Sequence, residues 1–415
     1  MLTQSDEYTG GDVLRVGNGA ELTAQDTTTP VPPALPWAAG PVVSHQPSTV
    51  VIDSGFQRPP SPIPLAQEAT PLAFEAPVKA VARRKRAAGL SLKIEGFSSS
   101  KTDVSLFHYS AANSRVYLLV YVDDIIMMGN DPSLITSLLH RLSSTFKIRD
   151  LGTPGFFLGI ETVKTDIGLM LSQRRYMKDI LSRAGMTECK PLTTPAAVTP
   201  PVSSTAELHD NPTQYRHVVG ALQYLTITRP DLSYAVNRLC QFMHTPTADH
   251  WGLVKRVLQY IKGTLDYVLQ LTVSETSALH AYSDSDWASC PLDRKSIGGY
   301  VVFLGSNLIS WLSRKQRTVA RSSTEAEYKA LADVAAEVAS IVSLLRELGL
   351  HTGVPPTLWC DNLGATYTCA NPVFHARTKH AEIDFHFVRD KCEGEKPKSD
   401  SILSDSIHLE GATKS

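Results

Sequence analysis

The sequence has no closely paired cysteines, no excess of either charge and no long apolar run. Its six cysteines are scattered, without a CxxC pair, which argues against a zinc site or a disulfide framework and favours a reducing compartment. The formal net charge of −1 means that any contact with a polyanion must come from local basic patches. No apolar run approaches the roughly 18 residues that span a bilayer, and the N-terminus lacks the apolar stretch of a signal peptide. These absences predict an intracellular protein, cytoplasmic or nuclear, without a membrane segment.

The composition divides the chain into two zones. Residues 1–89 are rich in Pro, Ala, Ser and Thr without a sustained period, so we expect a disordered segment, because it cannot bury enough apolar surface to offset its chain entropy. Its basic run (Arg83, Arg84, Lys85 and Arg86) is interpreted as a solvated surface, with a nuclear-import signal or a phosphate-binding patch as alternatives. The rest has the composition of a globular protein, and the length predicts about two to four domains.

From about residue 105 the sequence alternates between strand and helix patterns. A Pro/Thr-rich linker at 190–205 interrupts them. Before this linker we expect a hairpin with strands 115–122 and 123–129, a helix over 131–146, two short strands within 150–173 and a helix over 173–186. After the linker we expect two helices, over 228–243 and 249–263.

The last part predicts an α/β sheet with mixed strand directions. The expected order is strand 278–288, a hairpin of strands 296–305 and 307–316, a long helix over 322–349, a strand at 356–361 and a further helix. The long helix begins with a capping box of Ser322 and Glu325. Its apolar stripe is formed by Ala330, Val334, Val338, Ile341 and Leu345.

Acidic residues stand at the ends of several predicted elements. Asp123 and Asp124 lie side by side in the apolar run LLVYVDDIIMMGN, and Asp284, Glu327 and Asp361 fall in a strand, in the long helix and after a later strand. Clustered carboxylates repel one another unless cations neutralise them, and oxygen-rich clusters suit Mg²⁺ or Mn²⁺. Two such ions about 4 Å apart activate a water and stabilise the leaving oxygen in phosphodiester cleavage. A pair of metal ions is therefore one hypothesis for Asp284, Glu327 and Asp361, with solvated surface acids as the alternative. For Asp123 and Asp124 the alternative is that both cap an ordinary exposed turn.

A string of motifs over residues 90–392 resembles the C-terminal part of the pol polyprotein of copia-type LTR retrotransposons. LLVYVDDIIMMGND resembles the reverse-transcriptase palm hairpin with its YxDD box. FFLGIE, CKPLTTP, YRHVVGALQYLTITRPDLSYAVN and HWGLVKRVLQYIKGT resemble the thumb and connection segments. SDSDWASCPLDRKSIGGYVVFLG, RSSTEAEYKAL, LWCDN and HARTKHAEIDFHFVRD resemble the RNase H domain of that family.

The resemblance implies a division of the chain into domains. It implies an incomplete reverse-transcriptase palm over 90–172, a helical thumb or connection over 173–274 and an RNase H-like mixed sheet with flanking helices over 275–392. The Pro-rich segment 1–89 and a polar tail, 393–415, lie outside the resemblance. The activities implied are RNA-directed DNA synthesis and two-metal hydrolysis of the RNA strand of RNA/DNA hybrids. The implied partners are an RNA template with a DNA primer and an RNA/DNA hybrid, and the oligomeric state stays open.

The resemblance also assigns roles to the acids of the last part. Asp284, Glu327 and Asp361 correspond to three carboxylates of the RNase H metal site. Spacing alone does not separate Asp284 from Asp286, and the YSD alignment favours Asp284. The motif TEAEY favours Glu327 over Glu325.

At the hairpin, Asp123 corresponds to a ligand of the polymerase metals, with Asp124 beside it. The family also needs an upstream palm aspartate followed by Ala-Phe, and no such segment is present. Asp53 follows an apolar run without a matching context. We therefore expect no DNA synthesis by this chain alone.

The family's fourth RNase H carboxylate is missing from the matching segments. Asp400 and Asp405 lie in the polar tail without supporting spacing, so we expect at most residual hybrid cleavage. His380 and His386 are six positions apart, which is too far around a helix for a shared metal. Whether the chain is an enzyme, a non-catalytic nucleic-acid-binding remnant or a decayed transposon fragment without function stays open.

Basic residues precede the long helix and form the predicted nucleic-acid contact. They could hold phosphates of an A-form-like hybrid, and a solvated basic edge is the alternative. The four residues are Arg314, Lys315, Arg317 and Arg321.

Overall fold

A computed structural model of the chain describes most residues from 96 to 366. The described ranges are 96–111, 114–121, 124–145, 148–197, 207–350, 353–362 and 364–366, with Val388 and the strand segments 14–15, 21–22, 78–83 and 408–411. The chain divides into two units, Met1–Gln46 and Pro47–Ser415. In the first, β1 (Leu14–Arg15) pairs antiparallel with β2 (Glu21–Leu22). Everything below concerns the second unit.

The first large sheet has six antiparallel strands. They are β4 (Ser98–Ser99), β5 (Leu106–Ala111), β6 (Ser114–Tyr121), β7 (Asp124–Gly129), β3 (Val78–Arg83) and β8 (Ile148–Gly152), in this spatial order. Helix α2 (Pro132–Thr145) contributes buried Ile135, Leu138 and Leu142 to the core of this sheet. Asp131 begins the helix, because its carboxylate accepts the backbone N–H groups of residues 133 and 134. The predicted hairpin and the helix after it are thus confirmed.

Strand β3 corrects part of the prediction for residues 1–89. Residues Val78–Arg83 lie in the segment expected to be disordered, yet they pair antiparallel with β7 on one side and β8 on the other. Sheet hydrogen bonds on both sides satisfy the backbone of a short Val/Ala-rich stretch, which composition averaged over 89 residues conceals. The rest of the segment, including Asp53, lies outside the described residues apart from β1 and β2.

A second sheet brings together strands from either side of a helical region. Its order is β12 (Leu269–Thr272), β11 (Gly168–Ser172), β10 (Ile160–Thr165) and β9 (Phe156–Phe157). The helices between β11 and β12 are α3 (Arg174–Arg183), α4 (Pro212–Leu225), η1 (Pro230–Leu232), α5 (Ser233–Cys240) and α6 (Ala248–Gly263). Their buried faces form one apolar core, centred on residues such as Met177, Tyr215, Leu222, Val236 and Leu258. Helix α4 was not predicted, although Asn211 caps it and Pro212 starts it.

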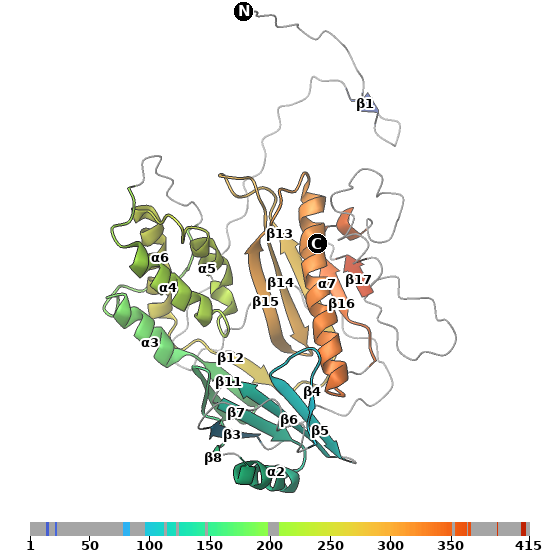
Figure 1. The fold of residues 1–415 in the computed structure, drawn as a ribbon. Helices are drawn as coiled ribbons and strands as arrows, with labels where there is room; N and C mark the ends of the chain where they lie inside the picture. The colour runs from blue at the N-terminus through green and yellow to red at the C-terminus, as the bar shows by residue number, and fades with distance from the viewer. Residues whose placement is uncertain are drawn as a thin grey trace, which may run out of the picture. The chain divides into compact units, whose positions relative to one another are not determined.

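The last sheet has five strands with mixed directions, as predicted. They are β15 (Asn307–Lys315), β14 (Ile297–Leu304), β13 (Leu279–Ser285), β16 (Thr357–Cys360) and β17 (His408–Gly411), in this spatial order. The first three pair antiparallel, whereas β16 lies parallel to β13 and β17 parallel to β16. The long helix α7 (Ser323–Glu347) lies against this sheet (Figure 1).

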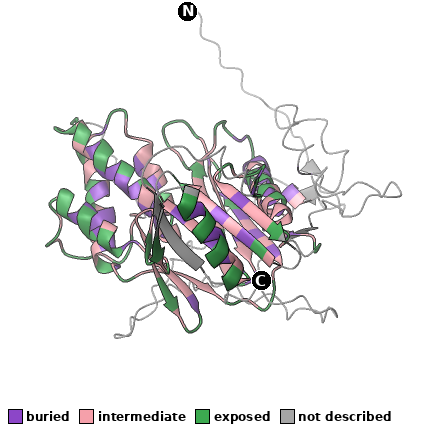
Figure 2. Cartoon of the chain, turned by 60° about the horizontal axis from the view of Figure 1, so that its bottom comes forward, coloured by how far each residue is buried: buried purple, intermediate pink, exposed green. Residues whose placement is uncertain are grey.

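Helix α7 is fixed by the apolar stripe that its sequence predicts. Ala330, Val334 and Val338 are buried, and Ile341 and Leu345 pack partly buried against the same core. Figure 2 shows that the helices are in general exposed along one side and buried along the other. Such a pattern is expected of helices that pack one apolar face against a core. Among the described residues, no helix is both long and apolar enough to cross a bilayer.

The C-terminal end of α7 is tied to the first sheet by hydrogen bonds. Gly349, with φ of +66°, ends the helix, and a Cβ there would lie 2.2 Å from a guanidinium nitrogen of Arg115. The same guanidinium donates to the carbonyl oxygens of Leu348 at 3.3 Å and Gly349 at 2.7 Å. The Ser100 hydroxyl donates to Glu347, and this hydrogen bond lowers the pKa of that carboxyl. Strand β6 and the segment before β5 therefore hold one end of the helix whose other end carries Glu327.

Candidate metal centre

Two predicted acids are brought together by neighbouring parallel strands. Because β13 and β16 run in the same direction, their C-terminal ends lie at the same edge of the sheet. The register pairs Ser283 with Cys360, so one step further along both chains places Asp284 beside Asp361. Buried Ala281 and Leu358 anchor the two strands in the core behind them. The strands thus determine the spacing of these carboxylates although 77 positions separate them in the sequence.

The third acid comes from the beginning of α7. Glu327 is the fifth residue of the helix and is buried, with 6% of its surface exposed. Its neighbour Tyr328 is buried in the core that α7 shares with β13 and β16. One carboxylate oxygen from each of Asp284, Glu327 and Asp361 lies within 4.8 Å of the others. The structure therefore gathers these three predicted site residues into one cluster, with Asp284 exposed and Asp361 half-buried.

The donor set fits a hard divalent cation. Three carboxylates supply oxygen ligands of high negative charge, which Mg²⁺ and Mn²⁺ prefer over the nitrogen and sulfur ligands of zinc. Burial of Glu327 makes mutual repulsion costly, because water screens a buried charge poorly. A cation between the oxygens would offset that repulsion. The cluster therefore offers three oxygen ligands that could hold a divalent cation.

Asp286 and Glu325, the sequence alternatives to Asp284 and Glu327, have other partners in the structure. The Asp286 carboxylate accepts the backbone N–H of Ile297 at 2.7 Å and so closes the start of β14 onto the end of β13. Glu325 accepts the backbone N–H of Arg321 at 2.9 Å and pairs with Lys329 at 2.8 Å. The Ser322 hydroxyl accepts the Glu325 N–H at 3.1 Å, which is one of the two hydrogen bonds of the predicted capping box, whereas the Glu325 carboxylate accepts the N–H of Arg321. Both acids thus support the local backbone at the edge of the cluster.

The hairpin aspartates are described only in part. Asp124 begins β7 opposite Tyr121, the last residue of β6, and is half-buried. Asp123 lies outside the described residues, as do His380, His386, Asp400 and Asp405. The structure therefore places the hairpin and Asp124 and leaves the predicted pairing of Asp123 with a metal as a prediction.

The four basic residues predicted to contact nucleic acid separate into two groups. Arg314 pairs with Asp333 at 3.3 Å, and Lys315 pairs with Asp293 at 2.9 Å. Burial by itself would lower the pKa of Lys315, but the hydrogen bonds from its ammonium group to Asp293 and Cys290 raise it. The hydrogen bond from Lys315 in turn holds the pKa of Asp293 well below its usual range. Intramolecular pairing therefore accounts for two of the four cations.

Arg317 and Arg321 form the second group. Both are exposed, and within the described part of the chain neither side chain is paired with an acid. They lie on residues 316–322, the loop between β15 and α7, which leads directly to the helix carrying Glu327.

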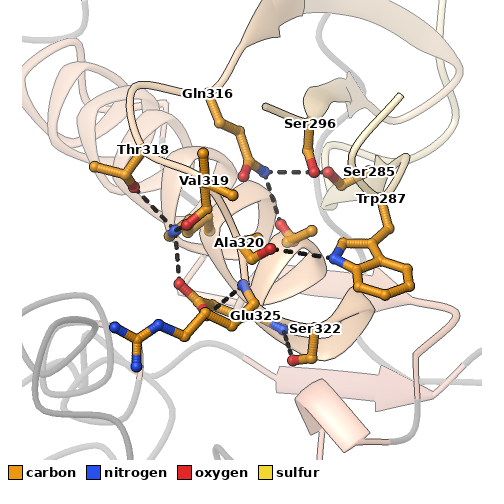
Figure 3. Close-up of polar contacts among 12 residues, drawn as sticks. Ser285, Trp287, Ser296, Gln316, Thr318, Val319, Ala320, Ser322 and Glu325 are labelled. Carbon is orange, nitrogen blue, oxygen red and sulfur yellow. Dashed lines mark hydrogen bonds and ion pairs between the residues drawn. The ribbon is translucent and has the colours of Figure 1, made fainter. Parts of the chain in front are cut away.

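This loop is held in place from both ends (Figure 3). The Gln316 amide donates to the Ser285 hydroxyl at 3.1 Å and to the Ala326 carbonyl at 2.8 Å. The Trp287 indole N–H donates to the Ala320 carbonyl at 3.2 Å. Trp287 is a residue that sequence reasoning missed. The available signal was an aromatic side chain in a polar stretch directly after the strand that carries Asp284.

Comparisons with known proteins give one matching family model and several similar proteins. A family model described as "Reverse transcriptase (RNA-dependent DNA polymerase)" matches residues 85–198. The "Retrovirus-related Pol polyprotein from transposon RE1" of Arabidopsis thaliana is 52% identical over 300 residues, which is 72% of this chain and 20% of the relative. The Pol polyprotein from transposon TNT 1-94 of Nicotiana tabacum is 35% identical over 340 residues, covering 78% of this chain and 26% of the relative.

A shorter relative is covered over most of its length. The "Putative transposon Ty5-1 protein" of Saccharomyces cerevisiae is 30% identical over 252 residues, which is 60% of this chain and 82% of the relative. By contrast, the chain spans about a fifth of the length of the RE1 polyprotein. The matches to the two Pol polyproteins cover far more of this chain than the family model does.

Proposed function

This chain belongs to the copia-type retrotransposon Pol polyprotein family, and we propose that its last sheet with α7 is an RNase H-like nuclease unit that hydrolyses the RNA strand of RNA/DNA hybrids. One observation carries the proposal: Asp284 in β13, Glu327 in α7 and Asp361 directly after β16 each place one carboxylate oxygen within 4.8 Å of the others. The reaction class is metal-assisted phosphodiester hydrolysis.

The three carboxylates would hold the metal, and the rest of the unit keeps them in place. When bound, divalent ions supply an activated water and stabilise the leaving oxygen. Asp284 and Asp361 extend from paired strands, and Glu327 extends from a helix capped by Ser322, so their geometry exists before substrate binds. Such preorganisation is what a two-ion site requires, because small displacements of ligands are costly in rate.

Hybrid cleavage is the direct test. A hybrid with a labelled RNA strand is expected to be cut by the purified chain with Mg²⁺ or Mn²⁺, weakly, since three of the family's four carboxylates are assigned. Asp361→Asn should reduce the rate at least about 100-fold, because several kcal/mol of charge stabilisation are lost. Asp333→Asn, on the exposed side of α7, is the matched control and should cut like the unaltered chain.

The outcomes separate the open alternatives. Cleavage that survives Asp361→Asn rules out the proposed site. Salt-sensitive binding of the hybrid by a folded protein that never cuts would instead support a non-catalytic nucleic-acid-binding remnant. A folded protein that neither binds nor cuts would support a decayed fragment.

For the first sheet we propose only part of a reverse-transcriptase palm. The β6–β7 hairpin and Asp124 support this assignment, together with the family match over residues 85–198. The family's upstream palm aspartate is not recognisable in the 415 residues, and two-metal phosphoryl transfer needs carboxylates that hold both ions.

Primer extension tests this second proposal. With an RNA template, a DNA primer and nucleotides, the chain alone is expected to add no nucleotide. Incorporation that disappears on Asp123→Asn would contradict the proposal and show that another residue completes the palm site.

A further inference from the structure

Trp287 combines two features that rarely occur together. Its side chain is 57% exposed, yet its indole N–H is committed to the Ala320 carbonyl at 3.2 Å (Figure 3). A large apolar ring in water is unfavourable, and the hydrogen bond limits its freedom to fold back onto the protein. The structure thus presents one flat aromatic face at a fixed place.

The support of Trp287 is itself rigid. Ala320 lies in the loop 316–322, and Lys329 donates from α7 to the Thr318 hydroxyl at 2.9 Å and to the Val319 carbonyl at 3.5 Å. The Glu325 carboxylate fixes the next peptide by accepting the Arg321 N–H. The loop that holds the indole is therefore fastened to the first turns of the helix that carries Glu327.

The surroundings of Trp287 indicate what the indole face would contact. The loop exposes two guanidinium groups, Arg317 and Arg321, and the side chain of Val319, which is 46% exposed. Trp287 itself follows Asp284 by three positions. Arg321 directly follows Ala320, which accepts the indole N–H, and among the described residues neither guanidinium group pairs with an acid. An aromatic face and cations held by one loop fit a nucleic-acid strand, because bases and sugars stack on the ring while phosphates attract the cations. A neutral apolar partner would leave both cations without a partner.

We propose that Trp287, held by Ala320, forms with Arg317 and Arg321 a contact site for the nucleic-acid strand that enters the carboxylate cluster. The indole stacks on a base or sugar, and the two guanidinium groups contact phosphates of the same strand. This inference rests on the proposed function, because it takes the hybrid as the ligand, and it adds the residues that position the strand. Trp287 is a positioning residue, since it would hold the strand without touching the reacting phosphate.

Binding without divalent metal tests the inference separately from cleavage. The full chain is titrated with a fluorescently labelled RNA/DNA hybrid in the presence of a chelator, so that no cutting occurs. Trp287→Ala should raise Kd about 5- to 100-fold, as for other stacking aromatics. Trp287→Phe, which keeps an aromatic ring but loses the hydrogen bond to Ala320, should recover part of the loss. Tyr234→Ala, which removes an aromatic ring that is 43% exposed on α5, is the control and should bind normally.

The arginines give a second, independent readout. Arg321→Ala should weaken binding and lower the slope of log Kd against log salt by about one, because one phosphate contact is lost. Trp287→Ala should leave that slope unchanged, since stacking releases no counterion. A purely structural role for Trp287 would also show as a lower unfolding temperature, which is measured for every variant.

The results distinguish the two proposals. If Trp287→Ala is as stable as the unaltered chain and binds the hybrid within a factor of two of it, the contact site is wrong, whatever the cleavage assay shows. If the chain never cuts the hybrid but loses binding on Trp287→Ala and regains part of it with Trp287→Phe, the contact site is supported and the nuclease proposal fails.

Discussion

Glu327→Gln is expected to stabilise the last sheet in metal-free protein by about 1–2 kcal/mol and to abolish most of its stabilisation by Mg²⁺. The three carboxylate oxygens lie within 4.8 Å of one another, and two full charges at that separation repel by about 3 kcal/mol at an effective dielectric constant of about 20. Glutamine keeps the shape of the buried side chain and removes its charge. Water around exposed Asp284 screens part of the repulsion, so the expected gain is smaller than the Coulomb figure.

Glu325→Gln is a control for which we expect the opposite change in stability. Glu325 is as buried as Glu327 and lies on the same helix two positions earlier. The Glu325 carboxylate, however, pairs with Lys329 and accepts the Arg321 N–H. Glu325→Gln should therefore destabilise the helix start by about 1–2 kcal/mol while leaving the response to metal unchanged. The two substitutions remove the same charge from the same turn of the helix, so a general effect of net charge cannot produce opposite signs.

Hydrogen exchange is the suitable measurement, because a chain with several sheets need not unfold in one step. Amides of β13, β16 and the start of α7 are followed with chelator and with increasing Mg²⁺. At a metal concentration of about 100 times Kd, the unaltered chain should gain about 2.7 kcal/mol of protection. Loss of protection in metal-free Glu327→Gln, equal to that of Glu325→Gln, would contradict the expected repulsion. A response to Mg²⁺ in Glu327→Gln as large as in the unaltered chain would show that the cluster does not hold the cation.

The competing acids show which part of this site could be predicted from the sequence. Alignment with the family motifs favours Asp284 and Glu327, and these two lie in the carboxylate cluster, whereas Asp286 and Glu325 are used by nearby backbone groups. The pairing of β13 with β16 could not be derived from local pattern. It joins segments separated by a hairpin and a long helix, and strand periodicity carries no information about the partner strand.

The basic residues illustrate the same limit. A run of four cations before α7 looks uniform in the sequence. Arg314 and Lys315 are nevertheless paired with Asp333 and Asp293, which lie on α7 and in the loop between β13 and β14. Only the folded arrangement separates them from the two exposed arginines, because salt bridges depend on distances between elements.

Helix α4 was missed for a different reason. Its sequence holds a start signal at Asn211 and Pro212, and its apolar residues Tyr215, Val218 and Leu222 recur at helical spacing. The signal for this helix is therefore local and present in the sequence. Strand β12, by contrast, is four residues long and pairs with a strand about 100 positions earlier, so no local signal distinguishes it from a loop.

Arg229→Met is expected to destabilise the helical region by about 3–5 kcal/mol, because it breaks a buried ion pair from one side. Arg229 is 1% exposed, and its guanidinium binds both oxygens of Asp231, at 2.9 and 2.7 Å. It also donates to the carbonyl and hydroxyl oxygens of Thr264, at 3.1 and 2.8 Å. One side chain therefore joins η1 to the end of α6.

The aromatic residues around this pair increase the cost of breaking it. The guanidinium lies 5.7 Å from the ring centre of Tyr260 and 5.3 Å from that of Tyr267. The Tyr260 hydroxyl donates to Asp231 at 2.9 Å, and burial together with the Asp231 charge raises the pKa of Tyr260. Methionine at position 229 would leave the Asp231 carboxylate, whose side chain is 18% exposed, without its cation.

Hydrogen exchange in α3, α4 and α6 measures the loss, with two further variants as tests of its cause. Arg183→Met breaks an exposed i,i+4 pair with Asp179 and should change stability by no more than about 0.5 kcal/mol. The double variant Arg229→Met/Asp231→Leu removes both charges and should recover much of the stability lost in Arg229→Met. If the double variant is no more stable than Arg229→Met, the loss comes from packing around the guanidinium and not from the charge left on Asp231.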